Sequence, residues 1–545
     1  MTTISEAPGA AAAAPVRRGR GPAAGGVLAL ARVESVRLLR HPAMLCGLAA
    51  YLALWGYALV TGDAANRYPV LQDGSRYIQG HLLLPVAGTL LAANLGVLRS
   101  RRNGVEPVYA VMVLGIRART LAHLLAVVPA AVLSALLACA RIGCLAARPD
   151  AVGTIQWGEV ATGPAVVLLA GVLGVLTARL IASAAAAPLV LVVLAVFTLA
   201  AAVQNSAHWR WLAVVAIENE SAQPLPSELL GRPVGWHLLW LTALTAVFAC
   251  AALLRGRPDG VPDGPRHGTR ALWACTAAAA ALALLSGALQ TRPLPDAVAR
   301  ARTATTEHPA REQKCEKQGD VTYCAFPEFT GRVKQWDAVV RGVLERAPDD
   351  VAKAPYAVRQ RIFRAGVEEQ RSVPLPQAAW DADDRRAGTP RAVPVGTWWS
   401  AGSAGTDTER DAVAEFSVLF AYRVVTGSVP DEPRLNTVCG SRAVLTLWLA
   451  SQATGESAAA LRDLDSSSTG GPVLLVLGSA AGVAFESRET QFAKDLLALP
   501  ADRIGARVKA AWGELTAPGT STDRAADLLG LSAPARLPAD ESSCR

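Results

Sequence analysis

Lysine is missing from the first half of this sequence, and charged residues of every kind are scarce there. The first lysine of the 545-residue chain is Lys314, and charged residues make up 18% of the whole. Average soluble domains carry about 25% charged residues. The deficit lies between residues 43 and 290, where alanine, leucine and valine dominate. This distribution excludes a chain made only of ordinary soluble domains, and it predicts a membrane half followed by a soluble half.

Motifs that would give the chain a nucleotide site or a catalytic site are also missing. No G-x-x-x-x-G-K-[ST] phosphate loop occurs. His308 is the only histidine after residue 290, so a zincin motif or a Cys–His nucleophile is hard to build there. The sequence Gly478-Ser-Ala-Ala-Gly482 lacks the central serine of a nucleophile elbow. We therefore expect no catalytic residue, metal site or cofactor, and we expect Asp383 and Asp384 on a solvated surface.

The formal net charge of +8 does not indicate a nucleic-acid partner. The arginines of the first half flank apolar runs and form no single basic stripe. Membrane topology produces such flanking charges, whereas nucleic-acid recognition needs a clustered basic element. We expect the lipid bilayer as the partner of this half, and no nucleic acid.

Seven apolar stretches are about 20 residues long, the length that a helix needs to cross a bilayer. They lie at about 43–61, 80–98, 121–140, 162–180, 184–203, 236–254 and 271–289. The predicted fold class is an all-α polytopic membrane bundle of about seven transmembrane helices plus a mainly α extracytoplasmic domain. The predicted domains are a disordered cytoplasmic tail (1–26), an amphipathic interfacial helix (27–42), the transmembrane domain (43–290) and the extracytoplasmic domain (291–545).

Arginine counts give this bundle a direction in the plasma membrane. With the N-terminus inside, sixteen arginines fall in inner segments and six in outer segments. The inner arginines are Arg17, Arg18, Arg20, Arg32, Arg37, Arg40, Arg99, Arg101, Arg102, Arg117, Arg119, Arg179, Arg255, Arg257, Arg266 and Arg270, and the outer ones are Arg67, Arg76, Arg141, Arg148, Arg210 and Arg232. Basic residues favour the cytoplasmic side, so the N-terminus is predicted inside. An odd number of spans then places the C-terminal domain outside.

The C-terminal domain is predicted to be mainly helical. Helix-like periodicity covers 336–346, 356–370, 409–426, 443–453, 491–499 and 504–515. Residues 473–478 are compatible with a short strand, and 374–394 read as a Pro- and Asp-rich connector.

Four cysteines in this domain are compatible with two disulfides in an oxidising compartment. Cys315 and Cys324 enclose a short loop with Gly319 at its turn, which makes them the most plausible pair. Cys439 and Cys544 would form the second pair, although four cysteines allow three connectivities. A nucleophilic role for Cys439 is the weaker alternative to a disulfide or a core position.

The segment before the first span alternates arginine with apolar residues at helical spacing. Leu28, Ala31, Ser35, Leu38 and Leu39 share one face of such a helix. The charged positions are Arg32, Glu34, Arg37 and Arg40. The pattern is typical of an interfacial amphipathic helix, and an ordinary basic flank of a membrane span is the alternative.

The inner loop between the second and third spans carries a short apolar patch at 108–114 between two arginine clusters. The patch is too short to cross a bilayer. A short helix that presents Tyr109 and Met112 to a cytosolic partner would use it, as in helix-in-groove recognition.

Together these two features resemble the type-2 permease subunits of ATP-binding-cassette transporters over about residues 28–255. In that family an elbow helix precedes the first of six spans, and the loop between spans two and three contacts the ATPase subunit. Gly104 and the acidic and basic positions Glu106, Arg117 and Arg119 match residues that recur there. The seventh span and the outer domain depart from the family's six-span core.

The resemblance implies a permease subunit of an exporter that works as a homodimer or a heterodimer with a second permease and is driven by a separate cytosolic ATP-binding-cassette ATPase. Its expected coupling residues are Glu106, Tyr109, Met112, Arg117 and Arg119. The alternative function is a membrane-anchored extracytoplasmic sensor or assembly factor, in which the bundle serves only as the anchor. Charged or titratable side chains near the span ends, such as His81, His123, His237 and Arg179, are weaker candidates for lining a pathway.

Overall fold

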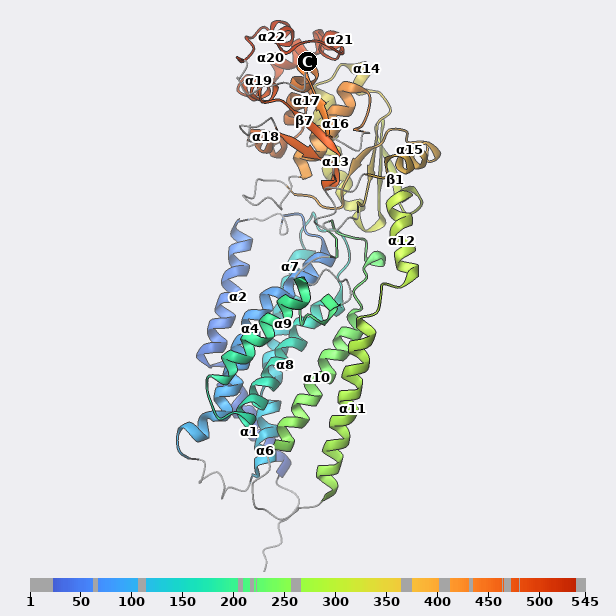
Figure 1. Ribbon diagram of the computed structural model, residues 1–545. Helices are drawn as coiled ribbons and strands as arrows, with labels where there is room; N and C mark the ends of the chain where they lie inside the picture. Colours follow the sequence, from blue (N-terminus) through green and yellow to red (C-terminus); the bar gives the residue numbers. More distant parts are fainter. Residues whose placement is uncertain are drawn as a thin grey trace, which may run out of the picture.

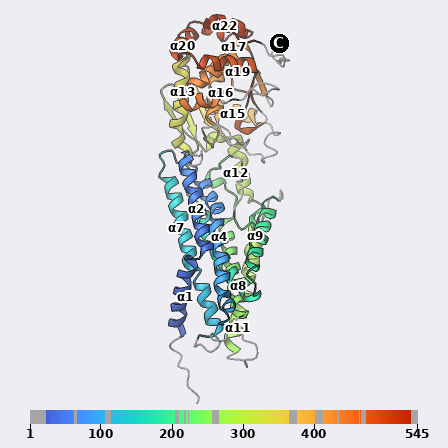
Figure 2. The ribbon, with the colours of Figure 1, turned by 90° about the vertical axis from the view of Figure 1, so that its left-hand side faces the viewer.

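The computed structural model describes residues 23–61, 67–105, 114–203, 209–215, 220–221, 223–255, 266–363, 375–400, 412–430, 435–462, 464, 472–479 and 481–535. A long helical bundle carries a second part, which contains both helices and sheets, on one of its ends (Figures 1 and 2). We call the end that carries this C-terminal part the upper end, as it is drawn in Figure 1, and the opposite end the lower end.

The bundle is built from long apolar helices. They are α1 (Ala23–Leu39), α2 (Pro42–Thr61), α4 (Leu71–Arg102), α6 (Ile116–Leu125), α7 (Val128–Ala146), α8 (Trp157–Leu180), α9 (Ala186–Val203), α10 (Val234–Arg255) and α11 (Arg266–Gln290). Within the described ranges, six segments are long and apolar enough to cross a membrane: α2, α4, α6 continued by α7, α8, α10, and Gly268–Gln290 of α11. The chain is therefore a multi-pass α-helical membrane protein.

The fifth of the seven predicted spans falls short of a spanning helix. The predicted range 184–203 forms α9, whose 18 residues rise only about 27 Å against a hydrocarbon core of about 30 Å. The described residues thus contain six candidate spans, and α9 is a shorter apolar helix. However, α9 starts toward the lower end, where α8 finishes, and leads back to the upper end (Figure 1). The N-terminal helix and the C-terminal part therefore still lie at opposite ends of the bundle (Figure 2).

Glycines allow the central helices to approach closely. A Cβ on Gly88 of α4 would lie 2.6 Å from the carbonyl oxygen of Ala43 in α2. A Cβ on Gly174 of α8 would lie 2.4 Å from the carbonyl oxygen of Leu90 in α4. Small residues are common where two membrane helices cross, because the hydrophobic effect does not favour helix association in lipid and close packing must supply the attraction. Helices α4 and α8 thus form the closely packed centre of the bundle, and α2 packs against α4 at its edge.

The C-terminal part combines helices with two small sheets. Its helices are α12 (Asp296–Glu307), α13 (Val333–Glu345), α14 (Asp349–Ala352), α15 (Gln377–Arg386), α16 (Ala412–Thr426), α17 (Gly440–Gln452), α18 (Gly455–Arg462), α19 (Ser487–Leu497), α20 (Ala501–Ala510), α21 (Trp512–Leu515) and α22 (Thr522–Leu529). One sheet has the order β1 (Lys314–Gln318), β2 (Val321–Ala325), β3 (Ala357–Gln360), β4 (Val393–Val395), and the other has the order β5 (Leu435–Val438), β7 (Gly482–Phe485), β6 (Val473–Leu475).

The C-terminal part was predicted to be mainly helical, and its two sheets were largely not predicted. The predicted helix 356–370 is wrong at its start, because Ala357–Gln360 forms β3 in the middle of the first sheet. The predicted connector 374–394 contains helix α15. The helices predicted around α13, α16, α17, α19 and α20 are present, and the predicted strand at 473–478 begins with β6. One continuous apolar core joins these elements, with Trp336 and Trp448 fully buried in it.

The predicted disulfide between Cys315 and Cys324 is confirmed. The two residues face each other across the antiparallel pair β1–β2 and are bonded. Cys439 also takes part in a disulfide. This agrees with the predicted disulfide and not with a nucleophilic role for Cys439. Cys544, its predicted partner, lies outside the described residues.

Candidate functional site

The N-terminal helix α1 is held against the start of the third crossing at the lower end. Val27 and Ala31 of α1 form an apolar cluster with Ala122 of α6. Of the residues predicted to share one face of this helix, Ala31 and Leu38 are buried, whereas Leu28 is 64% exposed and Val27 is buried in its place. The reason is that α6 covers the Val27 side of α1. Helix α1 therefore packs on protein along one face and leaves Leu28 free to meet lipid or solvent.

An ion-pair cluster fixes α1 to the end of α4. Glu34 is buried and accepts a hydrogen bond from Arg37 at 2.8 Å, and its two oxygens lie 3.4 Å from the guanidinium of Arg99. Beside this pair lies a cavity of about 20 Å³ that is also lined by His123 of α6, room for about one water. Of the four charged positions predicted on the helix, Glu34 and Arg37 are thus joined. The other two, Arg32 and Arg40, are exposed.

The structure describes only part of the predicted coupling loop. Gly104 follows α4 with φ +65°, a left-handed conformation that a residue with a Cβ adopts only at a cost. Glu106, Tyr109 and Met112 lie outside the described residues. Arg117 and Arg119 both lie in the first two turns of α6, and Arg117 donates a hydrogen bond to Thr269 Oγ1 of α11 at 3.2 Å. The described half of the loop thus meets α11 as well as α1.

A network of buried charges occupies the upper end of the bundle, and no motif in the sequence indicated it. Glu159 in the first turn of α8 lies 2.5 Å from Arg232 and 3.7 Å from Arg76 of α4. Arg76 lies 3.0 Å from Glu220, and Glu220 lies 2.6 Å from Arg302 of α12. Each of these five side chains is at most 6% exposed. The network therefore links two candidate spans to the first helix of the C-terminal part.

The charges of this network stabilise one another against the cost of burial. Burial favours the neutral form of Glu220, but Arg76, the backbone N–H of Gly231 and Arg302 together outweigh it, so the pKa of Glu220 is lowered. Burial also lowers the pKa of Arg232, and Glu159 opposes that shift. Removing any one partner would leave an uncompensated charge in a low-dielectric site, which costs more than the intact pair contributes.

Polar contacts outside the spans continue the junction. Gln72 at the start of α4 donates to Glu328 Oε2 at 3.0 Å, and Glu328 also accepts from the backbone N–H of Ser227 at 3.0 Å. Arg332 donates to the carbonyl oxygens of Tyr68 at 2.6 Å and Asp150 at 2.8 Å. Burial lowers the pKa of Arg332 to about 10, with Asp150 opposing. The bundle loops thus share hydrogen bonds with the C-terminal part.

An apolar cluster seals the same junction. Val70 and Val152 from two bundle loops pack with Leu225, Phe326 and Phe329, and Val70 pairs with Val152 as an isolated parallel bridge. Phe326 and Phe329 belong to the C-terminal part and are fully buried. The junction is therefore a continuous piece of protein interior, with apolar contacts beside the charge network.

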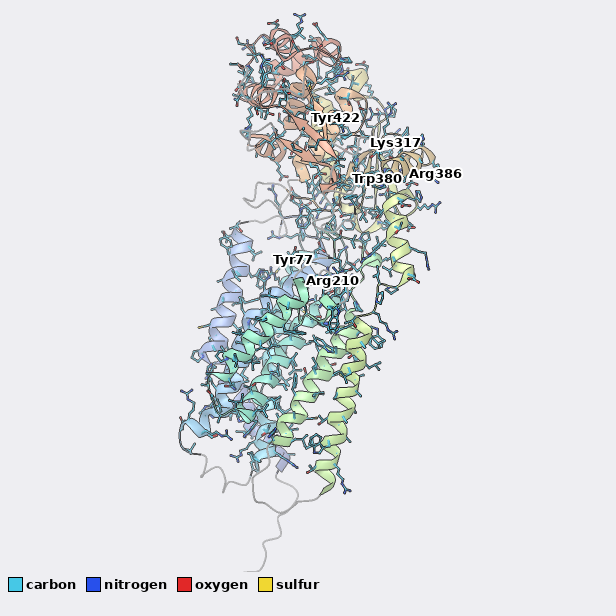
Figure 3. All side chains as sticks on the ribbon, in the orientation of Figure 1. Tyr77, Arg210, Lys317, Trp380, Arg386 and Tyr422 are labelled. Atoms are coloured by element: carbon cyan, nitrogen blue, oxygen red, sulfur yellow. A yellow bond between two sulfur atoms is a disulfide. The ribbon has the colours of Figure 1, made fainter. Side chains whose placement is uncertain are left out.

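A second buried charge cluster lies inside the C-terminal part and corrects an expectation. Asp384 is 2% exposed and lies 2.9 Å from Arg359 and 2.6 Å from Arg361, so it is not a solvated acid. Asp383 is 4% exposed and accepts from the backbone N–H of Ala310. Arg361 also stacks over Trp380, which Figure 3 labels on this part of the molecule. Helix α15 places both carboxylates inward, which its Asp-rich sequence did not indicate.

The histidines near the span ends differ in their surroundings. His237 of α10 is fully buried between Gln290 Oε1 at 3.1 Å and the carbonyl oxygen of Val214 at 3.2 Å, which is a bonded core position. His81 lies 3.1 Å from the carbonyl oxygen of Tyr77 one turn earlier in α4. His123 lines the small cavity beside Glu34, together with His41. Because both ring nitrogens of His237 have protein partners, His237 is the weakest of these candidates for lining a pathway.

In the described part of the chain, no group of three or more His, Cys, Asp or Glu side chains is placed to hold a metal ion. Comparisons of the chain with protein-family models, with curated proteins and with solved structures find no match. Two sites in the described residues combine buried charges with contacts between elements: the α1–α4–α6 junction at the lower end and the charge network at the upper end.

Proposed function

We propose that this chain is the membrane-spanning permease subunit of an ATP-binding-cassette exporter, working as a dimer with an identical or a second permease chain. A separate cytosolic ATPase drives it from the lower end. In this proposal the lower end faces the cytosol and the C-terminal part is extracytoplasmic. ATP-driven rearrangement opens a path between two bundles for a substrate whose chemistry the sequence does not define.

The observation that supports the proposal is the junction of α1, α4 and α6. Glu34 binds Arg99, and Val27 and Ala31 pack on Ala122, so the N-terminal helix is locked to both helices that flank the predicted coupling loop. A force applied to that loop would move α1, the end of α4 and the start of α6 together. A device that couples a cytosolic motor to membrane helices needs such a platform.

The upper network gives the C-terminal part a role in the same proposal. Arg302 of α12 reaches Glu220, which in turn holds Arg76 of α4. A displacement of α4 or α8 therefore changes contacts of the C-terminal part as well as those between spans. The proposed exporter moves this part during its cycle instead of carrying it on a loose tether.

Recovery of the ATPase with the purified chain tests the proposal. We expect an ATP-binding-cassette ATPase to co-purify with the wild type and to be lost when Tyr109→Asp and Met112→Asp are combined, because burying unpaired carboxylates costs several kcal/mol. Pro262→Asp, in another loop of the predicted inner side, is the matched control and should retain the ATPase. Full recovery with the double variant at equal expression would contradict the proposed contact.

The alternative is an extracytoplasmic sensor, and the interlocked junction is the observation that favours it. A ligand that binds to the C-terminal part and moves it would displace Arg302 and, through the ion pairs of Glu220, also α4. Under this alternative no ATPase co-purifies with the wild type, so the same experiment separates the two functions.

A further inference from the structure

An apolar groove opens at the lower end between four helices. Its volume is about 500 Å³, and its walls are almost entirely carbon: Ala24, Val27, Leu28, Arg117, Ala118, Leu121, Leu253 and Leu272. These residues come from α1, α6, α10 and α11. Three of the four helices belong to candidate spans, and the wall residues lie within about two turns of their lower ends. The groove is therefore at the depth where a bilayer changes from headgroups to acyl chains.

Among the described residues of the groove wall, Arg117 is the charged one. Its guanidinium is fixed by the hydrogen bond to Thr269, and no described carboxylate pairs with it. Leu121, one helical turn further along α6, lies about 6 Å deeper. A cationic group at the rim above an apolar wall matches a phosphate with an acyl chain beneath it.

The surroundings of the groove strengthen the match to an anion. The arginines at the lower end among the described residues are Arg32, Arg37, Arg40, Arg99, Arg101, Arg102, Arg117, Arg119, Arg179, Arg255 and Arg270. The acidic residue described at that end is Glu34, which Arg37 and Arg99 already neutralise. Trp273 is 61% exposed one residue after the wall residue Leu272, a position where an indole ring anchors at the headgroup level.

We infer that this groove binds one anionic phospholipid, with the phosphate on Arg117 and an acyl chain along Leu121, Leu253 and Leu272. Basic pockets between membrane helices on the cytoplasmic side select such headgroups. The inference needs only the groove and the charge of this end, so it holds whether the chain is a permease or a sensor. The bound lipid would fill the space between α1 and the α10–α11 hairpin and hold them at a fixed separation.

Native mass spectrometry of the delipidated full-length protein tests the inference. The protein is titrated with phosphatidylglycerol and with phosphatidylcholine of the same acyl chains, and the affinity of the tightest bound lipid is compared. We expect a preference for phosphatidylglycerol that falls about fivefold in Arg117→Gln, the effect of one arginine near a lipid surface. Ala118→Trp, which fills the groove, should weaken both lipids, whereas Arg102→Gln, an exposed arginine outside the wall, should change neither.

Three outcomes would overturn the inference. Equal losses in Arg117→Gln and Arg102→Gln would show a diffuse surface charge instead of a site. Equal affinity of the wild type for both lipids would show that no anion is recognised. Unchanged lipid binding in Ala118→Trp together with loss of a co-purifying ATPase would assign the groove to that protein. Each variant is first shown to retain the thermal transition of the wild type in detergent, so that a loss of lipid is not a loss of fold.

Discussion

Glu159 and Glu220 are the residues on which the upper end of the bundle depends. Glu159 sits in the first turn of α8, where the helix dipole favours a negative charge, and it meets Arg232 and Arg76 at once. Glu220 repeats this arrangement between Arg76 and Arg302. Three guanidiniums and two carboxylates alternate, so each charge has neighbours of the opposite sign. Such buried networks are stable only when complete.

Glu220→Gln is the substitution that tests this network at the residue scale. At neutral pH it leaves Arg76 and Arg302 without their shared carboxylate, and breaking a buried pair from one side costs about 3–5 kcal/mol. The pKa of Glu220 in the folded chain lies below its ordinary value of 4.5, so its stabilisation is complete above about pH 4.5 and is lost as the pH falls through the lowered pKa. We expect the thermal transition in detergent to be lower in the variant at pH 7, and the difference to shrink as the pH falls below 4.5.

Glu514→Gln is the matched control for that experiment. Glu514 pairs with Arg524 at 2.6 Å on the surface, where ion pairs contribute little, so the thermal transition should hardly change at any pH. A pH-independent loss of stability in Glu220→Gln would mean that the glutamine disrupts packing instead of removing a charge.

This network could not be predicted from the sequence, and the reason is physical. Arg76, Glu159 and Arg302 are far apart in the chain and show no shared periodicity; only the fold brings them together. In the sequence, a carboxylate next to an apolar helix, such as Glu159, has the same pattern as an ordinary charged flank of a membrane span. The same holds for Asp384, whose partners Arg359 and Arg361 lie on β3 and just after it. By contrast, the Cys315–Cys324 pair was predictable, because a short loop brings its members together without help from distant residues.

At the scale of elements, helices were easier to predict than strands. Helix α13 shows its buried face within its own 13 residues, and α20 does so within 10. The strands are three to five residues long, too short for a clear alternation, and β3 is buried on all four positions despite Arg359 and Gln360. The conformation of β3 is set by parallel partners some 35 residues away, such as Val393 opposite Val358. Helix α9 has the apolar composition of a span, but its 18 described residues are slightly fewer than the about 20 that a span usually has.

The disulfide gives an element-scale prediction for the β1–β2 hairpin. All five residues of β1 are exposed, so its hydrogen bonds to β2 and the Cys315–Cys324 bond hold it in place with little help from burial. Replacing Cys315 by Ser should reduce the stability of the hairpin by about 2–3 kcal/mol, as expected for a short closed loop. Limited proteolysis followed by mass spectrometry should then show faster cleavage within 311–325. Cys144→Ser, which removes a free cysteine in the bundle, should not change that rate, and equal rates in both variants would contradict the prediction.

At the scale of the whole molecule, the two ends of the bundle differ in charge and in what they carry. The lower end collects arginines around a single described carboxylate, and the upper end balances its charges internally and supports the C-terminal part. The excess of arginines at the lower end was predictable, because each basic flank is local to its span. The interlocking of bundle and C-terminal part was not, since Arg332 reaches bundle loops more than 180 residues earlier in the chain.

The orientation of the molecule is the last prediction, and it depends on α9. If α9 crosses the membrane in spite of its length, the chain crosses seven times and the two ends face opposite compartments; if it does not, six crossings put both ends on one side. The arginine-rich lower end favours the cytosol, so we expect seven crossings and an extracytoplasmic C-terminal part. Single cysteines at Asn103, after α4, and at Ala387, after α15, are both exposed reporters. In a background without the free cysteines Cys46, Cys139, Cys144, Cys250 and Cys275, an impermeant maleimide should label Ala387→Cys on intact cells and Asn103→Cys only after permeabilisation. Labelling of both on intact cells, or of neither, would show that α9 does not cross. The reverse pattern would invert the bundle, and the lower end would then be closed to a cytosolic ATPase.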